Sequence, residues 1–220
     1  MRNRAEEDYL KTIYELTVER DQKLIKSVEI AERFGYTDQS VNEMIKKLVQ
    51  KKLLVFYPYK GVELTHKGKN FAIRMIRAHR LWEVFLTHKL GVSWESVHAD
   101  AEMLEHASSD HVLDKLDKFL GYPKYCQHGN PIPNKKGQSR PAHQHVLLDF
   151  QTGDQVEIKR VMDAKELLDF LNHEKIKLND VFEIVQHDSF NQIMTLQSEQ
   201  QKHTFSYKTA NMIFAEKVKG

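Results

Sequence analysis

The chain has 220 residues, enough for one or two compact domains with a substantial hydrophobic core. Hydrophobic residues make up 40% and charged residues 29% of the sequence, which excludes a largely disordered chain. No stretch approaches the roughly 20 consecutive apolar residues of a membrane span. Residues 1–11 are too charged for a secretion signal, so we expect a cytoplasmic protein with no membrane partner.

The net charge of +2 is distributed unevenly along the chain. Residues 1–80 carry 17 Lys and Arg against 11 Asp and Glu, a balance of +6, whereas residues 81–130 carry 4 against 8, a balance of −4. This pattern suggests a polyanion contact in the first third and a cation site in the middle. Ordinary variation in surface charge is the alternative explanation.

Residues 27–54 predict two short helices joined by a tight turn. Ser27 can cap the first helix, Gly35 can end it in the left-handed conformation, and Thr37 or Asp38 can cap the second. The start and outward side of the second helix carry amides, hydroxyls and lysines, which can read base edges and hold phosphates. We therefore expect DNA contacts from Thr37, Gln39, Ser40, Asn42, Glu43, Lys46 and Lys47.

A hairpin-like segment follows the two helices. Residues 53–57 and 62–65 read as two short strands, with Tyr59 and Lys60 at the tip where they can touch the DNA backbone. The Lys67–Lys69 cluster near Gly68 is expected to close this first part of the chain, and helices are expected from about Asn70 to Leu120. Two amphipathic helices also occur as plain core scaffolding, so DNA binding rests on the combination with a wing.

The middle of the sequence carries carboxylates and imidazoles at helical spacing. Residues three and four apart share a helix face, and these acids and histidines have no intervening lysine. Such a stripe would repel itself, and a divalent cation would relieve the repulsion. The candidate ligands are His79 and Glu83 on one helix, and His98, Glu102, Glu105 and His106 on the next. A solvated helix face is the alternative.

The loop of residues 121–133 holds Cys126 and His128, two residues apart, between glycines and prolines. Such a pair can bind one metal if other ligands come from elsewhere in the fold. A structural tetrahedral zinc-finger site is excluded on ligand count, because Cys126 is the single cysteine and no cysteine pair exists. Simple packing is the alternative for this thiol.

The remainder of the chain predicts a linker and a small β-rich module. Residues 134–141 have almost no apolar content and read as a flexible connection. Alternating apolar positions after it predict short strands around one helix at residues 164–171, typical of a small β-barrel-like module.

Several separate motifs in order resemble one known family. They are EDYLKTIYEL (7–16), VNEMIKKL (41–48), GVELTHKG (61–68), HRLWEVFL (79–86), EMLEH (102–106) and CQHGNPIP (126–133). The chain resembles the diphtheria toxin repressor and manganese transport regulator family of metal-dependent transcriptional repressors, in its long, three-domain streptococcal-type branch.

The resemblance implies a mainly α fold with a small β module. It implies a winged helix-turn-helix DNA-binding domain at 1–70, a helical dimerisation and metal-binding domain with linker at 71–141, and an SH3-like domain, similar to iron-transport accessory proteins, at 142–220. The implied activity is repression of metal-uptake genes by a homodimer on pseudo-palindromic double-stranded operator DNA. No enzymatic activity and no small organic substrate are implied.

The resemblance also implies two metal sites. The first would use Glu83, Cys126, His128 and Asp163, with His79 and His98 nearby; the second would use Asp8, Glu102, Glu105 and His106. Iron-responsive members have methionine and cysteine where this chain has Asp8 and Glu102. The harder oxygen ligands favour Mn²⁺, with Fe²⁺ as the alternative and with Zn²⁺ or other divalent ions able to substitute in vitro.

Two residues depart from the family pattern. Lys11 stands at a position that is acidic in the short manganese regulators, which argues against their paired manganese arrangement here, and Ala99 replaces an acidic residue common in relatives.

Two alternatives to a metal-sensing repressor remain. One is a dinuclear metal hydrolase, although EMLEH lacks the HExxH pattern; the other is a winged-helix regulator with a purely structural metal.

Overall fold

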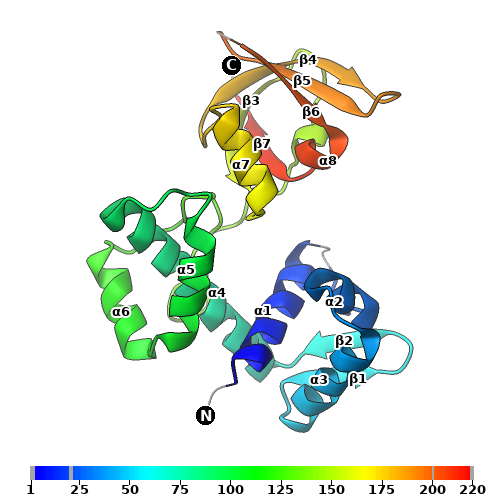
Figure 1. Ribbon diagram of the computed structural model, residues 1–220, viewed down its shortest axis with the longest axis vertical. Helices are drawn as coiled ribbons and strands as arrows, with labels where there is room; N and C mark the ends of the chain where they lie inside the picture. Colours follow the sequence, from blue (N-terminus) through cyan, green and yellow to red (C-terminus); the bar gives the residue numbers. More distant parts are fainter. Residues whose placement is uncertain (1–2, 20–21, 200, 219–220) are drawn as a thin grey trace. The chain divides into compact units, whose positions relative to one another are not determined.

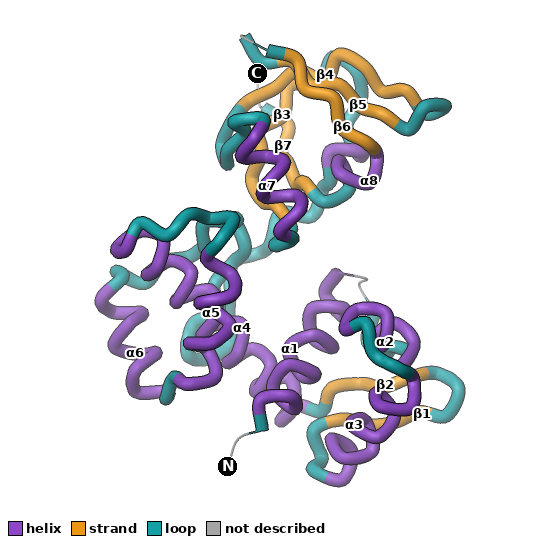
Figure 2. Tube along the Cα trace, in the orientation of Figure 1, coloured by secondary structure: helices purple, strands orange, loops and turns teal. Residues whose placement is uncertain are grey.

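The computed structural model describes residues 3–19, 22–199 and 201–218, and within these ranges it contains eight α-helices, one 3₁₀ helix and seven strands (Figures 1 and 2). The N-terminal elements are α1 (Arg4–Glu19), α2 (Ser27–Phe34), α3 (Asp38–Gln50), β1 (Leu54–Tyr57) and β2 (Gly61–Leu64). The central helices are α4 (His66–Leu90), α5 (Val97–Ala107) and α6 (Asp110–Phe119). The predicted class, mainly α with a small β module, is confirmed.

Helices α2 and α3 and the β1–β2 hairpin form the expected winged helix-turn-helix. Gly35 ends α2 with φ at 66°, a left-handed conformation that glycine adopts without strain. The Thr37 hydroxyl caps α3 by accepting a hydrogen bond from the Ser40 backbone N–H at 3.3 Å. Apolar side chains of α1, α2, α3 and the wing share one buried core that includes Leu10, Ile13, Ile30, Val41, Ile45, Leu48, Leu54 and Val62.

The expected cap of α2 was wrong. Ser27 is the first helical residue, and Lys26 holds the N-cap position. The Glu29 carboxylate accepts a hydrogen bond from the Lys26 backbone N–H at 2.6 Å. An acid three residues into the helix therefore satisfies the free backbone donor in place of the serine hydroxyl.

The expected start of the next helix, near Asn70, was also wrong. Helix α4 begins at His66 and runs through Gly68 without interruption. A Cβ atom at Gly68 would lie 2.1 Å from the Leu53 carbonyl oxygen. This glycine is explained by the close approach of the helix to the chain before β1, because only a residue without a side chain fits there.

The C-terminal module is a five-stranded antiparallel sheet in the order β6-β5-β4-β3-β7. Its elements, in chain order, are the 3₁₀ helix η1 (Leu147–Asp149), β3 (Gln155–Val161), α7 (Lys165–His173), β4 (Val181–Asp188), β5 (Ile193–Gln197), β6 (Lys202–Ser206), α8 (Tyr207–Ala210) and β7 (Ile213–Lys217). Alternating buried residues of the strands and the apolar face of α7 form a separate core. This is the predicted SH3-like module, although the sequence pattern did not single out β6, α8 or β7.

The chain forms two compact units. The first contains the described residues of Met1–His79 with Met103–Asp114 and Pro133–Gln138, and the second contains Arg80–Glu102, Lys115–Ile132 and the described residues of Ser139–Gly220. Asn134, in the predicted linker, forms a turn in which its side chain accepts hydrogen bonds from the backbone of Lys136 and Gln138.

Among the described helices, none combines the length and the apolarity that crossing a membrane requires.

Candidate metal centres and DNA-binding surface

One group of metal-ligand side chains lies in the second unit, and we call it the Cys126 cluster: Glu83, Cys126 and His128. One candidate ligand atom from each residue lies within 4.8 Å of the others. Glu83 comes from α4, and the two other residues come from the loop after α6. All three are buried, with at most 5% of each residue exposed. A thiolate, an imidazole and a carboxylate in one buried place form a donor set suited to a divalent transition metal.

The loop that carries the Cys126 cluster is fixed to β3. Gly129 has φ at 79°, and a Cβ atom there would lie 2.1 Å from the Lys159 carbonyl oxygen. The Val161 backbone N–H also donates a hydrogen bond to the His128 carbonyl oxygen at 2.9 Å. The glycine therefore permits both a left-handed turn and direct packing of the loop on the β3 backbone.

His128 is oriented by the groups on both sides of its ring. Its Nε2 lies 2.9 Å from the Trp94 carbonyl oxygen, to which it donates, and its Nδ1 lies 3.3 Å from Glu83 Oε1. Burial alone would lower the pKa of His128, but its contacts with Cys126 and Glu83 raise the pKa to about 11. The surroundings of His128 thus favour a positive charge, and a metal ion that replaces the proton would also supply one.

Asp163 and His98 lie beside the Cys126 cluster in the same unit. Asp163 follows β3 and places its Oδ2 2.7 Å from His98 Nδ1 and 4.0 Å from His128 Nδ1. His98 belongs to α5 and is about half exposed, whereas the Asp163 side chain is largely buried. The second unit therefore brings together Glu83, His98, Cys126, His128 and Asp163, five of the residues selected from the sequence.

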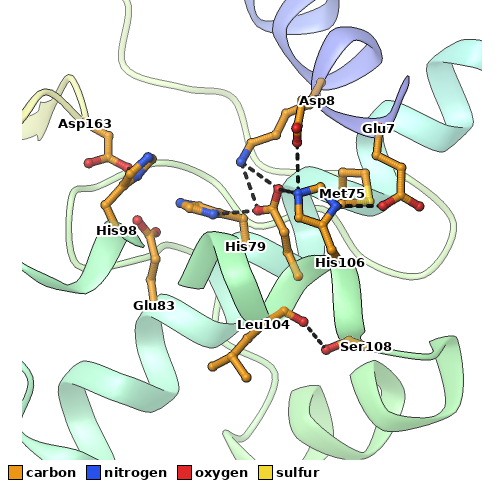
Figure 3. Close-up of polar contacts among 12 residues, drawn as sticks. Glu7, Asp8, Met75, His79, Glu83, His98, Leu104, His106, Ser108 and Asp163 are labelled. Carbon is orange, nitrogen blue, oxygen red and sulfur yellow. Dashed lines mark hydrogen bonds and ion pairs between the residues drawn. The ribbon is translucent and has the colours of Figure 1, made fainter. Parts of the chain in front are cut away.

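A second group lies in the first unit, and we call it the His106 cluster: Asp8, Glu105 and His106. His106 Nε2 lies 2.9 Å from Asp8 Oδ1 and 3.6 Å from Glu105 Oε1. Asp8 comes from α1 and His106 comes from α5 (Figure 3). Glu105 is also on α5. Two carboxylates and one imidazole offer hard oxygen and nitrogen donors, the set that Mn²⁺ or Fe²⁺ accepts.

Glu7 holds the other side of the His106 ring, as Figure 3 shows. Its Oε2 lies 2.7 Å from His106 Nδ1, and the residue is 2% exposed. A carboxylate at Nδ1 orients the ring and directs Nε2 toward Asp8 and Glu105. Sequence reasoning did not select Glu7, although its place on α1 next to Asp8 was a usable signal.

The side chains of Lys11 and His79 contact Glu105, which is fully buried. Lys11 Nζ donates hydrogen bonds to the two carboxylate oxygens at 2.9 and 3.1 Å, and His79 Nδ1 lies 2.6 Å from Oε2. Burial raises the pKa of Glu105, but the contacts with His79 and Lys11 outweigh it and lower the pKa overall. Glu105 is therefore ionised, and Lys11 supplies a positive charge directly at this cluster.

Glu102, which the resemblance assigned to the second site, falls outside the His106 cluster, and His79, which was expected beside the first site, contacts Glu105. His79 stands four residues before Glu83 on α4, so helical spacing puts both on one face, and its ring contacts Glu105. Glu102 is half-buried on α5, four residues before His106, and is not among the grouped donors of the described residues.

The predicted DNA-contacting residues are all exposed. They are Thr37, Gln39, Ser40, Asn42, Glu43, Lys46 and Lys47 at the start and on the outer side of α3, and Tyr59 and Lys60 between the wing strands. Tyr59 is fully exposed and has φ at 63°, a left-handed conformation unusual for a non-glycine residue. Three of these side chains also have contacts within the domain: Thr37 caps α3, Lys47 contacts Glu6, and Ser40 contacts Tyr9.

Comparisons with known proteins agree with this architecture. The profile described as "Iron dependent repressor, N-terminal DNA binding domain" matches residues 2–62, and "Iron dependent repressor, metal binding and dimerisation domain" matches residues 65–134. The iron-dependent repressor IdeR of Mycobacterium tuberculosis is 39% identical over 127 residues, which are 58% of this chain and 54% of IdeR. The chain thus aligns with about half the length of these first curated relatives.

Two further relatives align over more of their length. The transcriptional regulator MntR of Geobacillus kaustophilus is 34% identical over 116 residues, which are 53% of this chain and 80% of MntR. The structure of the manganese regulator SloR superimposes with a TM-score of 0.83 and 36% identity, covering 97% of this chain and 98% of SloR.

The fold and the two donor clusters define a metal-binding winged-helix protein. More specifically, the chain belongs to the diphtheria toxin repressor and manganese transport regulator family of metal-dependent transcriptional repressors.

Proposed function

We propose that this chain is a manganese-responsive transcriptional repressor. It binds pseudo-palindromic operator DNA as a homodimer in the cytoplasm and controls metal-uptake genes. The observation that carries the proposal is the His106 cluster, because Asp8 belongs to α1 of the winged helix whereas Glu105 and His106 belong to α5, in the segment matched by the metal-binding and dimerisation profile. We also propose domain boundaries at residues 1–70, 71–141 and 142–220.

The mechanism follows from which elements supply the ligands. An ion bound by Asp8, Glu105 and His106 would restrict the position of α1, and with it the winged helix, relative to α5. A ligand can shift a conformational balance only by its differential affinity for the two states, and a change from 1:99 to 99:1 requires about 5.5 kcal/mol. A second ion at the Cys126 cluster, completed by Asp163, would restrict the loop and the end of β3.

Restricting the winged helices matters because a dimer must present two recognition helices together. Recognition helices of such dimers enter successive major grooves about 34 Å apart. Amides and hydroxyls at the start of α3 would read base edges, and Lys46, Lys47 and Lys60 would neutralise phosphates. The operator is therefore expected to be a pseudo-palindrome whose half-sites match that spacing.

Manganese is the proposed metal for two reasons. The His106 cluster offers carboxylate oxygens and an imidazole rather than thioether or thiolate donors, which favours a hard ion early in the stability series. The solved relative SloR is itself described as a manganese regulator, whereas IdeR is described as iron-dependent. Fe²⁺ is the alternative, and Zn²⁺ is expected to bind in vitro.

The two rival functions differ in measurable ways. A dinuclear hydrolase needs an open metal position next to a positioned base, whereas Lys11 and His79 already contact Glu105 in the His106 cluster. Membership of a repressor family also disfavours an enzyme. A purely structural metal predicts that chelation unfolds the chain, whereas a sensor should remain a folded dimer without metal.

The test begins with operators selected from a random duplex library in the presence of Mn²⁺. Binding of the selected duplex is then measured by fluorescence anisotropy with Mn²⁺, Fe²⁺, Zn²⁺ or chelator, and folding is followed by thermal melting. The proposal expects Mn²⁺ to tighten binding by at least tenfold while the chelated protein melts cooperatively as a dimer. Equal affinity with Mn²⁺ and with chelator would reject it.

A further inference from the structure

Glu6 on α1 forms ion pairs with Lys47 on the recognition helix α3 and with Lys51 at the C-cap of that helix. Its Oε1 lies 2.9 Å from Lys47 Nζ on α3, and its Oε2 lies 2.7 Å from Lys51 Nζ at the C-cap of α3. The Glu6 residue is only 7% exposed, whereas the two lysine side chains are 44% and 47% exposed. One buried carboxylate thus contacts two cations that also face solvent.

The charge balance of this group bears directly on DNA binding. Lys47 and Lys51 each place an ammonium group against the Glu6 carboxylate. The ionised carboxylate cancels one of the two positive charges that the lysines would offer to a phosphate. It also restricts the lysine side chains to one region, which reduces the entropy they would lose on contacting DNA.

Glu6 is followed on α1 by Glu7 and Asp8, the two residues that contact His106. The three consecutive acids lie within one turn of the helix, so a rigid displacement of that turn moves all three. Glu6 contacts the recognition helix, while Glu7 and Asp8 contact the His106 cluster. Both sets of contacts lie within the first compact unit.

We propose that Glu6 couples the His106 cluster to the recognition helix, by acting as the movable counter-ion of Lys47 and Lys51. This inference rests on the proposed function, because it assigns a route for metal regulation of DNA binding. Besides restricting α1 and the winged helix relative to α5, the ion would fix the first turn of α1 within the DNA-binding domain, and this local adjustment sets where the Glu6 charge stands relative to the two lysines. That placement controls how strongly they attract an operator phosphate. The proposal thus adds Lys51, which was not selected from the sequence, to the residues that contact operator phosphates.

The variant Glu6→Gln removes the charge and keeps the shape of the side chain. Operator binding is measured by anisotropy for the full-length dimer with Mn²⁺ and with chelator, over a range of salt concentrations. Without Mn²⁺ the affinity should rise by about threefold or more, because a screened surface charge has an effect of that order. The activation ratio, defined as the operator Kd with chelator divided by the Kd with Mn²⁺, should fall by at least about threefold.

Three comparisons separate coupling from a general charge effect. Glu32→Gln removes an exposed acid from α2 of the same domain and should leave the activation ratio unchanged. Adding Lys51→Gln to Glu6→Gln should remove most of the affinity gained without Mn²⁺, because the two residues act on each other. Mn²⁺ affinity of the DNA-free Glu6→Gln dimer should stay within about twofold of wild type, since Glu6 is not a ligand.

The outcomes separate this inference from the proposed function. If wild type responds to Mn²⁺ and Glu6→Gln retains the same activation ratio as Glu32→Gln, the coupling role of Glu6 is wrong and the repressor function stands. If wild type shows no response to Mn²⁺, both fail. A Glu6→Gln dimer that loses its Mn²⁺ affinity in the absence of DNA would show that Glu6 supports the metal centre instead, which also overturns the inference.

Discussion

Removal of the Lys11 ammonium should strengthen Mn²⁺ binding at the His106 cluster. Lys11 donates to both oxygens of the fully buried Glu105, so an ion that uses this carboxylate must displace or share those hydrogen bonds. The Lys11 side chain is 12% exposed, so water screens the contact only partly. In Lys11→Met the ligands remain, the competing cation is lost, and an apolar side chain of similar length fills its place.

The expected gain in Mn²⁺ affinity follows from the net free energy of a hydrogen bond to a charged group, about 1.5 to 3 kcal/mol. Loss of one such competing bond corresponds to about ten- to hundredfold tighter Mn²⁺ binding. The assay is isothermal titration calorimetry of the DNA-free dimer. The exposed Lys23→Met serves as the charge-matched control and should leave the affinity unchanged. Unchanged or weaker Mn²⁺ binding by Lys11→Met would refute competition between the ammonium and the metal.

Three further predictions concern the side chains around the two clusters. Glu7→Gln should weaken Mn²⁺ binding at the His106 cluster by about ten- to hundredfold with little change in melting temperature, because the partner that orients His106 is weakened; full retention of affinity would contradict this. Metal binding at the Cys126 cluster should release a proton at pH 7, because His128, with its pKa raised to about 11, must lose its proton to bind a metal. The metal affinity should therefore fall as the pH is lowered. Calorimetry in buffers of different ionisation enthalpy measures the number of protons released, and a value of zero would contradict a role for His128 as a ligand. Gly129→Ala should lower the free energy of unfolding by about 2 kcal/mol more than Gly153→Ala, because both glycines have positive φ but only Gly129 packs against backbone. Urea denaturation measures both variants. Equal losses of unfolding free energy would show that the loop can move away from β3.

The DNA-binding domain was predictable because its signals are local. Gly35 and Thr37 mark the turn between two helices, and each acts through the backbone of its immediate neighbours. The start of α4 was misplaced because the sequence shows that Gly68 is a glycine but not that it lies against the Leu53 carbonyl oxygen. That contact depends on tertiary packing, which the local pattern does not reveal.

The candidate metal clusters were predictable from the sequence to the extent that helix periodicity brings their residues together. The spacing of carboxylates and imidazoles on α5 identified Glu105 and His106 directly. Their partners come from far along the chain, since Glu7 is 99 residues from His106 and Lys11 is 94 residues from Glu105. Asp8 was reached through family resemblance alone, because nothing local to α1 indicates a ligand.

If metal and operator bind the same arrangement of the chain, each must tighten the binding of the other. The Mn²⁺ affinity of the dimer is measured by calorimetry without DNA and with saturating operator. Linkage requires that operator tighten Mn²⁺ binding by the same factor by which Mn²⁺ tightens operator binding. We expect operator to tighten Mn²⁺ binding, and Mn²⁺ to tighten operator binding, by the same factor of at least tenfold. A Mn²⁺ affinity that does not change when operator is bound would contradict this mechanism.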